Sequence, residues 1–255
     1  MSDDAILLPE FVAEVLFGQS PGPAGAFVAG ILASAFVCTV MLTQAAIVIW
    51  AKRKVTAAFT DRIAINRHGP FGLLIIPADI VRLLSKELIV PVNADRPAFD
   101  LGPLLVTFSA LLGFAVIPMG TVGGVSIMVA DPETGVVFVF AAASLATLGL
   151  TMAGYASGNK FSLLGGLRAI AQNIAYEIPL VLTAASVVML TGTLQVGELV
   201  AAQQEPLVRL AGVAIPAWNA FVNPFAFVLF LTANLAEVGR NPFDTPEAPT
   251  ELVAC

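Results

Sequence analysis

The sequence predicts an all-α, polytopic membrane protein. Of its 255 residues, 58% are hydrophobic and only 12% are charged, whereas a soluble domain carries about 25% charged residues. The mean hydropathy is +0.89. Five apolar segments reach the length of about 20 residues that a helix needs to cross a bilayer. They cover residues 26–50, 101–120, 136–156, 177–196 and 211–234.

These segments are too long and too continuous for the strands of a membrane barrel, which alternate over about 10 residues. We therefore expect one membrane domain over residues 1–255. The N-terminus begins with the acids Asp3 and Asp4 and has no basic stretch before the first span. We expect no cleaved signal peptide, so that the first span itself directs the chain to the membrane.

The basic residues indicate how the chain is oriented. Eight of the twelve lie between residues 51 and 100, and three of the others lie in later loops on the same side of the membrane. Only Arg209 lies on the opposite side. Because basic loops face the cytoplasm, we predict a multi-pass protein of the cell membrane. Its N-terminus lies outside, and the 51–100 loop and the C-terminal tail are cytoplasmic.

The loop after the first span is far longer than an ordinary connection, which suggests a function or a structure of its own. Within it, residues 79–87 place Ile80 and Leu83 on an apolar side, and Asp79 and Lys86 on a charged side. This pattern predicts an amphipathic helix at the membrane surface. A basic loop that binds anionic lipid headgroups and a loop that lines a binding site are both compatible with these residues.

The composition limits the cofactors that this chain can hold. It has two cysteines and one histidine, too few for a cysteine-ligated iron–sulfur cluster, a haem pair or a zinc site. No glycine-rich phosphate loop is present either. We expect neither a metal nor a covalently bound cofactor, and any associated electron transfer would take place on centres held by partner proteins.

Two acids lie at the ends of predicted spans. Glu177 begins the fourth span and Glu237 follows the fifth, with Arg168 and Arg240 near them. An acid in hydrocarbon costs about 2.5 to 3.5 kcal/mol on insertion scales unless it faces protein or water. Glu177 and Glu237 are therefore either interface acids or proton-handling groups in a polar cavity that opens to the cytoplasm.

Three ordered blocks of sequence match the motifs of one known family. They are residues 53–87, with Arg53-Lys54, Arg62, Asn66, Gly69-Pro70, Gly72, Asp79 and Lys86; residues 165–177, with Ala175 in place of a serine; and residues 236–253. Together they resemble the membrane-embedded H subunit of bacterial respiratory complex I, the counterpart of the first subunit of mitochondrial NADH-quinone oxidoreductase.

The resemblance implies a function. Members of this family join the membrane arm to a peripheral arm that carries iron–sulfur clusters, and they form most of a quinone tunnel. It implies that quinone is the substrate, that quinone reduction is coupled to proton translocation, and that this enzyme subunit has no redox centre of its own. The implied partners are peripheral-arm subunits, other membrane-arm subunits and membrane lipid, with no nucleic acid.

The resemblance also implies roles for individual residues. By this resemblance, the quinone-binding residues are Arg53, Arg62, Asp79 and Lys86. The residues of the proton path are Glu177, Glu237, Asp244, Glu247 and Glu251. Arg168 and Arg240 are implied as their counter-charges.

The sequence departs from the family pattern at several positions. Lys52 stands where the family usually has Glu, Ala64-Ile65 replaces Gly-Pro, and Pro249 takes the place of a further Glu, as in hydrogenase-like relatives. One alternative is therefore the membrane anchor of a membrane-bound hydrogenase or a deazaflavin-dependent dehydrogenase. Another is a stand-alone ion transporter or a structural anchor. Because the family continues with further spans, we expect the chain to be an incomplete or split subunit.

Overall fold

The described part of the protein is a bundle of long helices with a few short strands at its ends and connections. The computed structural model describes residues 6–18, 22–67, 69–204, 206–210, 213–240 and 242–243. Within these residues, four helices are long and apolar enough to cross a membrane. They are α2 (Pro23–Phe59), α4 (Arg96–Phe114), α5 (Gly135–Ala156) and α6 (Lys160–Thr191). The predicted all-α membrane fold is confirmed.

A shorter apolar helix, α9 (Pro224–Glu237), lies in the fifth predicted span. It begins at Pro224, which needs no donor at a helix start, and the Asn223 side chain accepts a hydrogen bond from the amide of Ala226 at 3.2 Å. The residues before it form the short helix α8 (Asn219–Val222) and a strand. The helical part of this segment is therefore shorter than the apolar run in the sequence.

The remaining elements are short. The helices are α1 (Leu8–Phe17), α3 (Ile75–Leu84) and α7 (Val196–Ala202), with a 3-10 turn at Pro70–Gly72. Strand β3 (Val125–Ser126) lies between β1 (Ile6–Leu7), which is parallel to it, and β2 (Thr121–Val122), which is antiparallel. Strands β4 (Pro206–Leu210) and β5 (Val213–Pro216) form an antiparallel hairpin.

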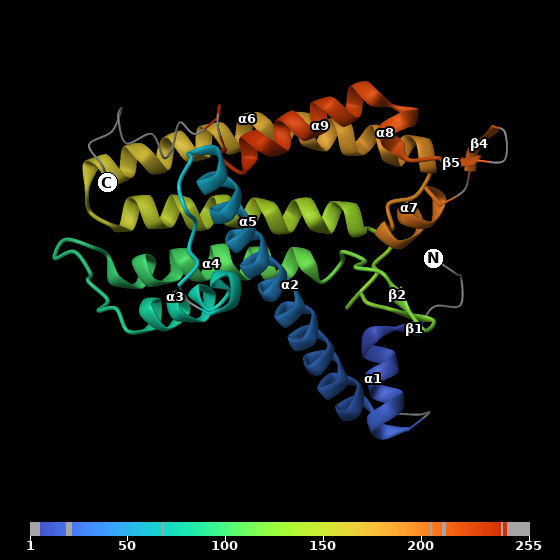
Figure 1. Ribbon diagram of the computed structural model, residues 1–255, viewed down its shortest axis with the longest axis horizontal. Coiled ribbons are helices and arrows are strands. Elements are labelled where there is room, and N and C mark those ends of the chain that lie inside the picture. Colours follow the sequence, from blue (N-terminus) through green and yellow to red (C-terminus); the bar gives the residue numbers. More distant parts are fainter. Residues whose placement is uncertain are drawn as a thin grey trace.

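Helices α4 and α5 lie side by side, and small residues let their backbones approach closely (Figure 1). A Cβ atom on Gly149 would lie only 2.8 Å from the carbonyl oxygen of Gly102. The buried hydroxyl of Ser109 donates to the carbonyl of Ala142 at 2.6 Å. Because lipid tails are as apolar as side chains, such close packing and interhelical hydrogen bonds are what hold membrane helices together.

Helix α6 packs between α5 and α9. Gly154 of α5 faces Gly166 of α6, so that a Cβ on Gly154 would lie 3.2 Å from the Cα of Gly166. On its other side α6 runs antiparallel to α9, while α2 crosses the bundle diagonally (Figure 1). This arrangement brings the middle of α6 to the C-terminal end of α9.

The predicted amphipathic helix is present as α3, but with different ends. It starts four residues earlier than predicted, at Ile75, and ends at Leu84, where the Ser85 hydroxyl donates to the carbonyl of Arg82 at 3.0 Å. None of its residues is buried, and Leu83 is 66% exposed. An unpacked helix with an apolar side suits the surface of a bilayer.

Candidate functional site

Polar side chains follow one another along the middle of α6. Residues three and four apart share a helix face, so this stretch presents two neighbouring polar stripes. The residues are Gln172, Asn173, Tyr176 and Glu177. Each of them finds a partner on α5 or near the end of α9, and the stripes thereby connect three helices.

The contacts with α5 come from two hydroxyl groups of an otherwise apolar span. The hydroxyl of Ser144 donates to Oε1 of Glu177. One turn further, Nδ2 of Asn173 donates to Oγ1 of Thr147 at 3.5 Å. Ser144 and Thr147 are three residues apart and therefore lie on the same face of α5.

The contacts with α9 come mainly from one amide. Nε2 of Gln172 donates to the carbonyl of Ala236 at 2.6 Å and to the carbonyl of Phe243 at 2.7 Å. The ring of Tyr176 meets that of Phe243 edge to face, with centroids 5.4 Å apart. These contacts fix the end of α9 and the residues after it against α6.

Glu237 is the last residue of α9 and lies beyond the predicted apolar span 211–234. The residue as a whole is exposed, but protein atoms surround its carboxyl closely enough to desolvate it. This desolvation raises the pKa of Glu237 above its ordinary value of 4.5, and the negative charge of Glu177 raises it further. We call the group formed by the α6 stripes, Ser144, Thr147 and Glu237 the polar junction.

The raised pKa of Glu237 predicts a pH-dependent stability. Below 4.5 the carboxyl is protonated in both the folded and the unfolded chain. As the pH rises through the folded pKa, the folded chain comes to carry an unfavourable carboxylate that costs less in the unfolded chain. We expect the melting temperature of Glu237→Gln, relative to wild type, to increase from acidic to neutral pH. Thermal unfolding in detergent at several pH values measures the two melting temperatures. A difference between them that does not change with pH contradicts this prediction.

A second cluster ties α2 to α3 and to the loop between them. Arg53 and Asp79 form an ion pair at 2.7 Å, and Arg82 approaches the same carboxylate at 3.7 Å. Nζ of Lys54 donates to Oδ1 of Asn66 at 2.6 Å. These bonds hold the loop against the C-terminal turns of α2.

The same region contains a cavity of about 770 Å³. Among the described residues that line it, four are cations and none is an acid. The four cations come from α2, the 60–65 loop and the residues after α9. We call it the cationic cavity, after Lys52, Arg53, Arg62 and Arg240. Arg53 and Arg62, which were expected to bind quinone, thus lie around the same cavity as Arg240, which was expected as a counter-charge of the acids.

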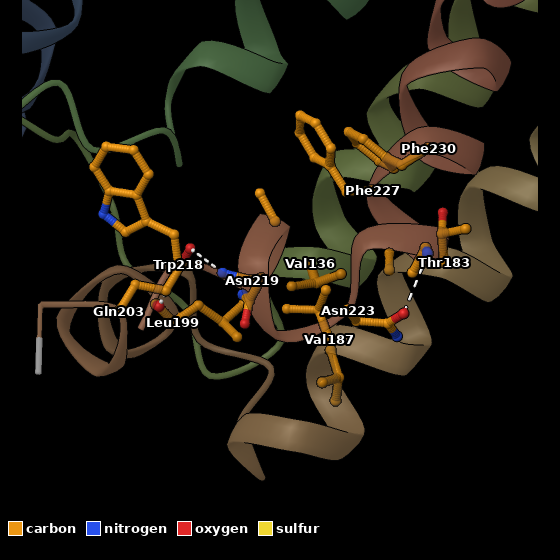
Figure 2. Close-up of a pocket in the computed structure, with 14 residues that line it drawn as sticks. Val136, Thr183, Val187, Leu199, Gln203, Trp218, Asn219, Asn223, Phe227 and Phe230 are labelled. Carbon is orange, nitrogen blue, oxygen red and sulfur yellow. Dashed lines mark hydrogen bonds between the residues drawn. The ribbon is translucent and has the colours of Figure 1, made fainter. Parts of the chain in front are cut away.

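A third feature is an apolar cavity of about 430 Å³ farther along the contact between α6 and α9 (Figure 2). Phe227 and Phe230 of α9 and Val187 of α6 line it, and Gln203 at its edge accepts a hydrogen bond from the amide of Asn219 at 3.3 Å. None of the described residues that line it is ionisable. This cavity suits an apolar group and is separate from the polar junction.

The structure places the other expected site residues as follows. Lys86 lies beyond the end of α3, outside the set of residues that line the cationic cavity. Arg168 lies on α6, nine residues before Glu177, or about 13 Å along the helix axis. Asp244, Glu247 and Glu251 lie outside the described residues. Within the described residues, no group of three or more His, Cys, Asp or Glu side chains is placed to hold a metal ion.

Five residues of the polar junction were not assigned to a site from the sequence: Ser144, Thr147, Gln172, Asn173 and Tyr176. Ser144 and Thr147 carried a signal, because they are polar residues at helical spacing in an apolar span. Gln172 shares a stripe with Tyr176, but its acceptors are main-chain carbonyls. No pattern of side chains marks such acceptors.

The long apolar helices and the ionisable groups between them define a polytopic membrane protein. The sequence profile of the family described as NADH dehydrogenase matches residues 32–255, and the chain belongs to this family. The chain is 46% identical over 220 residues to the H subunit of NADH-quinone oxidoreductase from Thermomicrobium roseum, covering 84% of this chain and 64% of that protein.

Two further relatives are similar, and both are H subunits of NADH-quinone oxidoreductases. The protein of Dehalococcoides mccartyi is 41% identical over 214 residues, covering 84% of this chain and 56% of that protein. The protein of Cytophaga hutchinsonii is 41% identical over 222 residues, covering 85% and 62%. The chain therefore spans less than two thirds of the length of these relatives.

Proposed function

We propose that this chain is the membrane subunit of an NADH-quinone oxidoreductase, which forms part of a quinone tunnel and couples quinone reduction to proton translocation. The names of its relatives support this function. The observation that carries the coupling is the interaction of Glu177 and Glu237, two carboxylates from different helices, at the polar junction. The partners that we propose are peripheral-arm subunits with iron–sulfur clusters and other membrane-arm subunits.

The cationic cavity is the proposed place of the quinone ring. A quinone is an apolar ring with carbonyl acceptors, and the cavity combines apolar walls at Val48 and Ile49 with the donors of Arg53 and Arg62. Asp79 positions Arg53 through their ion pair. Lys86 follows α3 on the same loop, and we propose that it borders the path of the quinone.

The polar junction is the proposed place of the proton chemistry. Electrons from a partner's cluster reduce the quinone, and the product takes up protons. The two carboxylates repel each other when both are ionised, so a proton held at one of them changes the cost of ionising the other. A proton that arrives at Glu237 can thereby favour the release of a proton from Glu177. The hydroxyl of Ser144 donates a hydrogen bond to Glu177 and stabilises its carboxylate.

The remaining members of the proposed path follow Glu237 in the sequence. Asp244, Glu247 and Glu251 would continue it, with Arg168 and Arg240 as counter-charges. We propose that this end of the bundle faces the cytoplasm of a cell whose plasma membrane holds the complex. The excess of basic residues on this side supports that orientation.

Kinetics of quinone reduction test the assignment of the cavity. We expect Arg62→Ala or Asp79→Ala to raise the apparent KM for quinone about tenfold, because a hydrogen bond to a charged group contributes about 1.5 to 3 kcal/mol. The measurement is NADH-dependent quinone reduction by membranes that hold the assembled complex. Arg67→Ala is the control, because Arg67 is an exposed cation of the same loop that does not line the cavity. Unchanged KM values in fully assembled variants would refute quinone binding here.

A further inference from the structure

The apolar cavity lies at the end of the α6–α9 contact that is opposite to the polar junction. Val187 of α6 comes ten residues after Glu177, and Phe227 of α9 comes ten residues before Glu237. The cavity and the junction are therefore about 15 Å apart along both helices. None of the described residues that line the cavity is proposed for the quinone or for the proton path. Its volume of about 430 Å³ lies in the range of ligand pockets, about 300 to 1,000 Å³.

Helix α9 is too short to cross the hydrocarbon core of a bilayer by itself. It has 14 residues, which give a length of about 21 Å, whereas the core is roughly 30 Å thick. Its last residue, Glu237, already lies beyond the apolar run 211–234, so its first residue lies within the depth of the core. A span that is shorter than the bilayer requires the surrounding lipid to adjust. The cavity lies beside these first turns of α9, at the depth of lipid hydrocarbon.

One edge of the cavity carries amide groups next to an aromatic ring. Gln203, Asn219 and Trp218 lie together there (Figure 2). Trp218 is 53% exposed, and tryptophan is enriched where membrane hydrocarbon meets the headgroups. Nε2 of Gln203 donates to the carbonyl of Leu199 at 3.1 Å, and it carries a second hydrogen for another acceptor. This edge therefore suits a ligand with neutral oxygen acceptors.

The wall away from this edge is apolar. Phe227 and Phe230 line it from α9 (Figure 2). The ring of Phe227 is 46% exposed although it lines the cavity, so the space is open on the side of α9. The other polar lining residues serve their own helices, since Thr183 donates to the carbonyl of Pro179 at 2.9 Å and Asn223 caps the start of α9.

A ligand with ester groups at the end of a hydrocarbon chain matches both parts of the cavity. Its chain covers the phenylalanine wall, and its ester carbonyls accept hydrogen bonds from the amides. The tail of an isoprenoid quinone matches only the wall, because it carries no acceptor. We propose that the apolar cavity binds one acyl chain of a membrane phospholipid, with the ester carbonyls of that lipid beside the side-chain amides of Gln203 and Asn219.

Lipid titration tests this proposal without any electron donor, so its failure is distinguishable from that of the proposed function. The full chain, with any subunits that stay bound, is purified in detergent and stripped of lipid. It is titrated with phosphatidylcholine that carries a photoactivatable diazirine at the end of one acyl chain, and bound lipid is counted by native mass spectrometry. After illumination, we expect the label of the most tightly bound lipid on residues 183–188 or 223–230. A label found only on other segments overturns the proposal.

Two neighbouring alanines of α6 provide matched variants. Ala184 lines the cavity, whereas Ala185 is exposed and is not among the described residues that line it. Ala184→Phe places a ring in the cavity and should weaken binding of the lipid about tenfold, the effect of roughly two buried methylene groups. Ala185→Phe adds the same ring outside the cavity and should leave binding unchanged.

Equal affinities of the two variants for the lipid overturn the proposal. So does displacement of the labelled lipid by ubiquinone as readily as by unlabelled phosphatidylcholine, because the cavity would then hold an isoprenoid tail. If Ala184→Phe fails to fold, the positions of the label in the wild type still decide the result.

Discussion

Replacing Glu237 by Gln in the assembled complex is expected to lower coupled turnover and proton translocation by about 10²-fold or more, the scale of a lost proton-transfer group. The substitution keeps the size of the side chain and its capacity for hydrogen bonding, but it removes the ability to take up and release a proton. Glu237 is the group whose carboxyl both desolvation and Glu177 hold toward the protonated form. It is therefore placed to respond to a change of charge nearby.

The measurement is NADH-dependent quinone reduction together with proton uptake in sealed vesicles. Glu133→Gln is a suitable control, because Glu133 is an exposed acid in the loop before α5, away from the polar junction. We expect Glu177→Gln to resemble Glu237→Gln, since the two act as a pair. Wild-type proton uptake and quinone reductase activity in Glu237→Gln would refute its role in the path.

Replacing Gly72 by Ala is expected to prevent the loop between α2 and α3 from packing, and so to reduce the amount of folded protein severely. A Cβ at this position would lie 2.1 Å from the carbonyl oxygen of Ile65, and the backbone has φ of +77°. The carbonyl belongs to the main chain, so it cannot move aside as a side chain does. Ile65 also lines the cationic cavity, so the displacement would distort that cavity.

The variant Gly123→Ala distinguishes the steric clash with Ile65 from the strain of a positive φ. Gly123 also has a positive φ, +60°, but no atom lies within 4 Å of the position where its Cβ would be. We expect this control to cost only the strain of a left-handed residue, about 1 kcal/mol. Thermal stability and the yield of protein after purification in detergent measure both variants. Similar stability of the two variants would show that the approach to Ile65 is not what requires glycine.

The long helices could be predicted from the sequence because a membrane span is marked by composition alone. The apolar run 136–156 and helix α5 differ by a single residue at the start. The fourth span shows the limit of this method. Helix α6 starts at Lys160, 17 residues before the start of the predicted span 177–196, and it continues through Pro179. Its first turns mix apolar residues with Lys160, Arg168 and Gln172, and these polar residues interrupt the continuous apolar run that marks a span.

The site could be predicted only in part, because its residues are far apart in the sequence. The acids Glu177 and Glu237 were found from their positions at the ends of spans. Their proximity depends on the packing of α6 against α9, which no local pattern contains. The ends of α3 were also missed, since the apolar residues before Asp79 do not alternate with charges.

Because of the two hydrogen bonds that Gln172 donates, a substitution at position 172 has a larger effect on this contact than one at position 236 or 243. Its acceptors at residues 236 and 243 are backbone carbonyls, which every amino acid supplies. As far as hydrogen bonding is concerned, those two positions can drift during evolution while the link between α6 and α9 persists. A change at position 172 removes both bonds at once, so the hydrogen bonding of this contact restricts the amino acid at that one position.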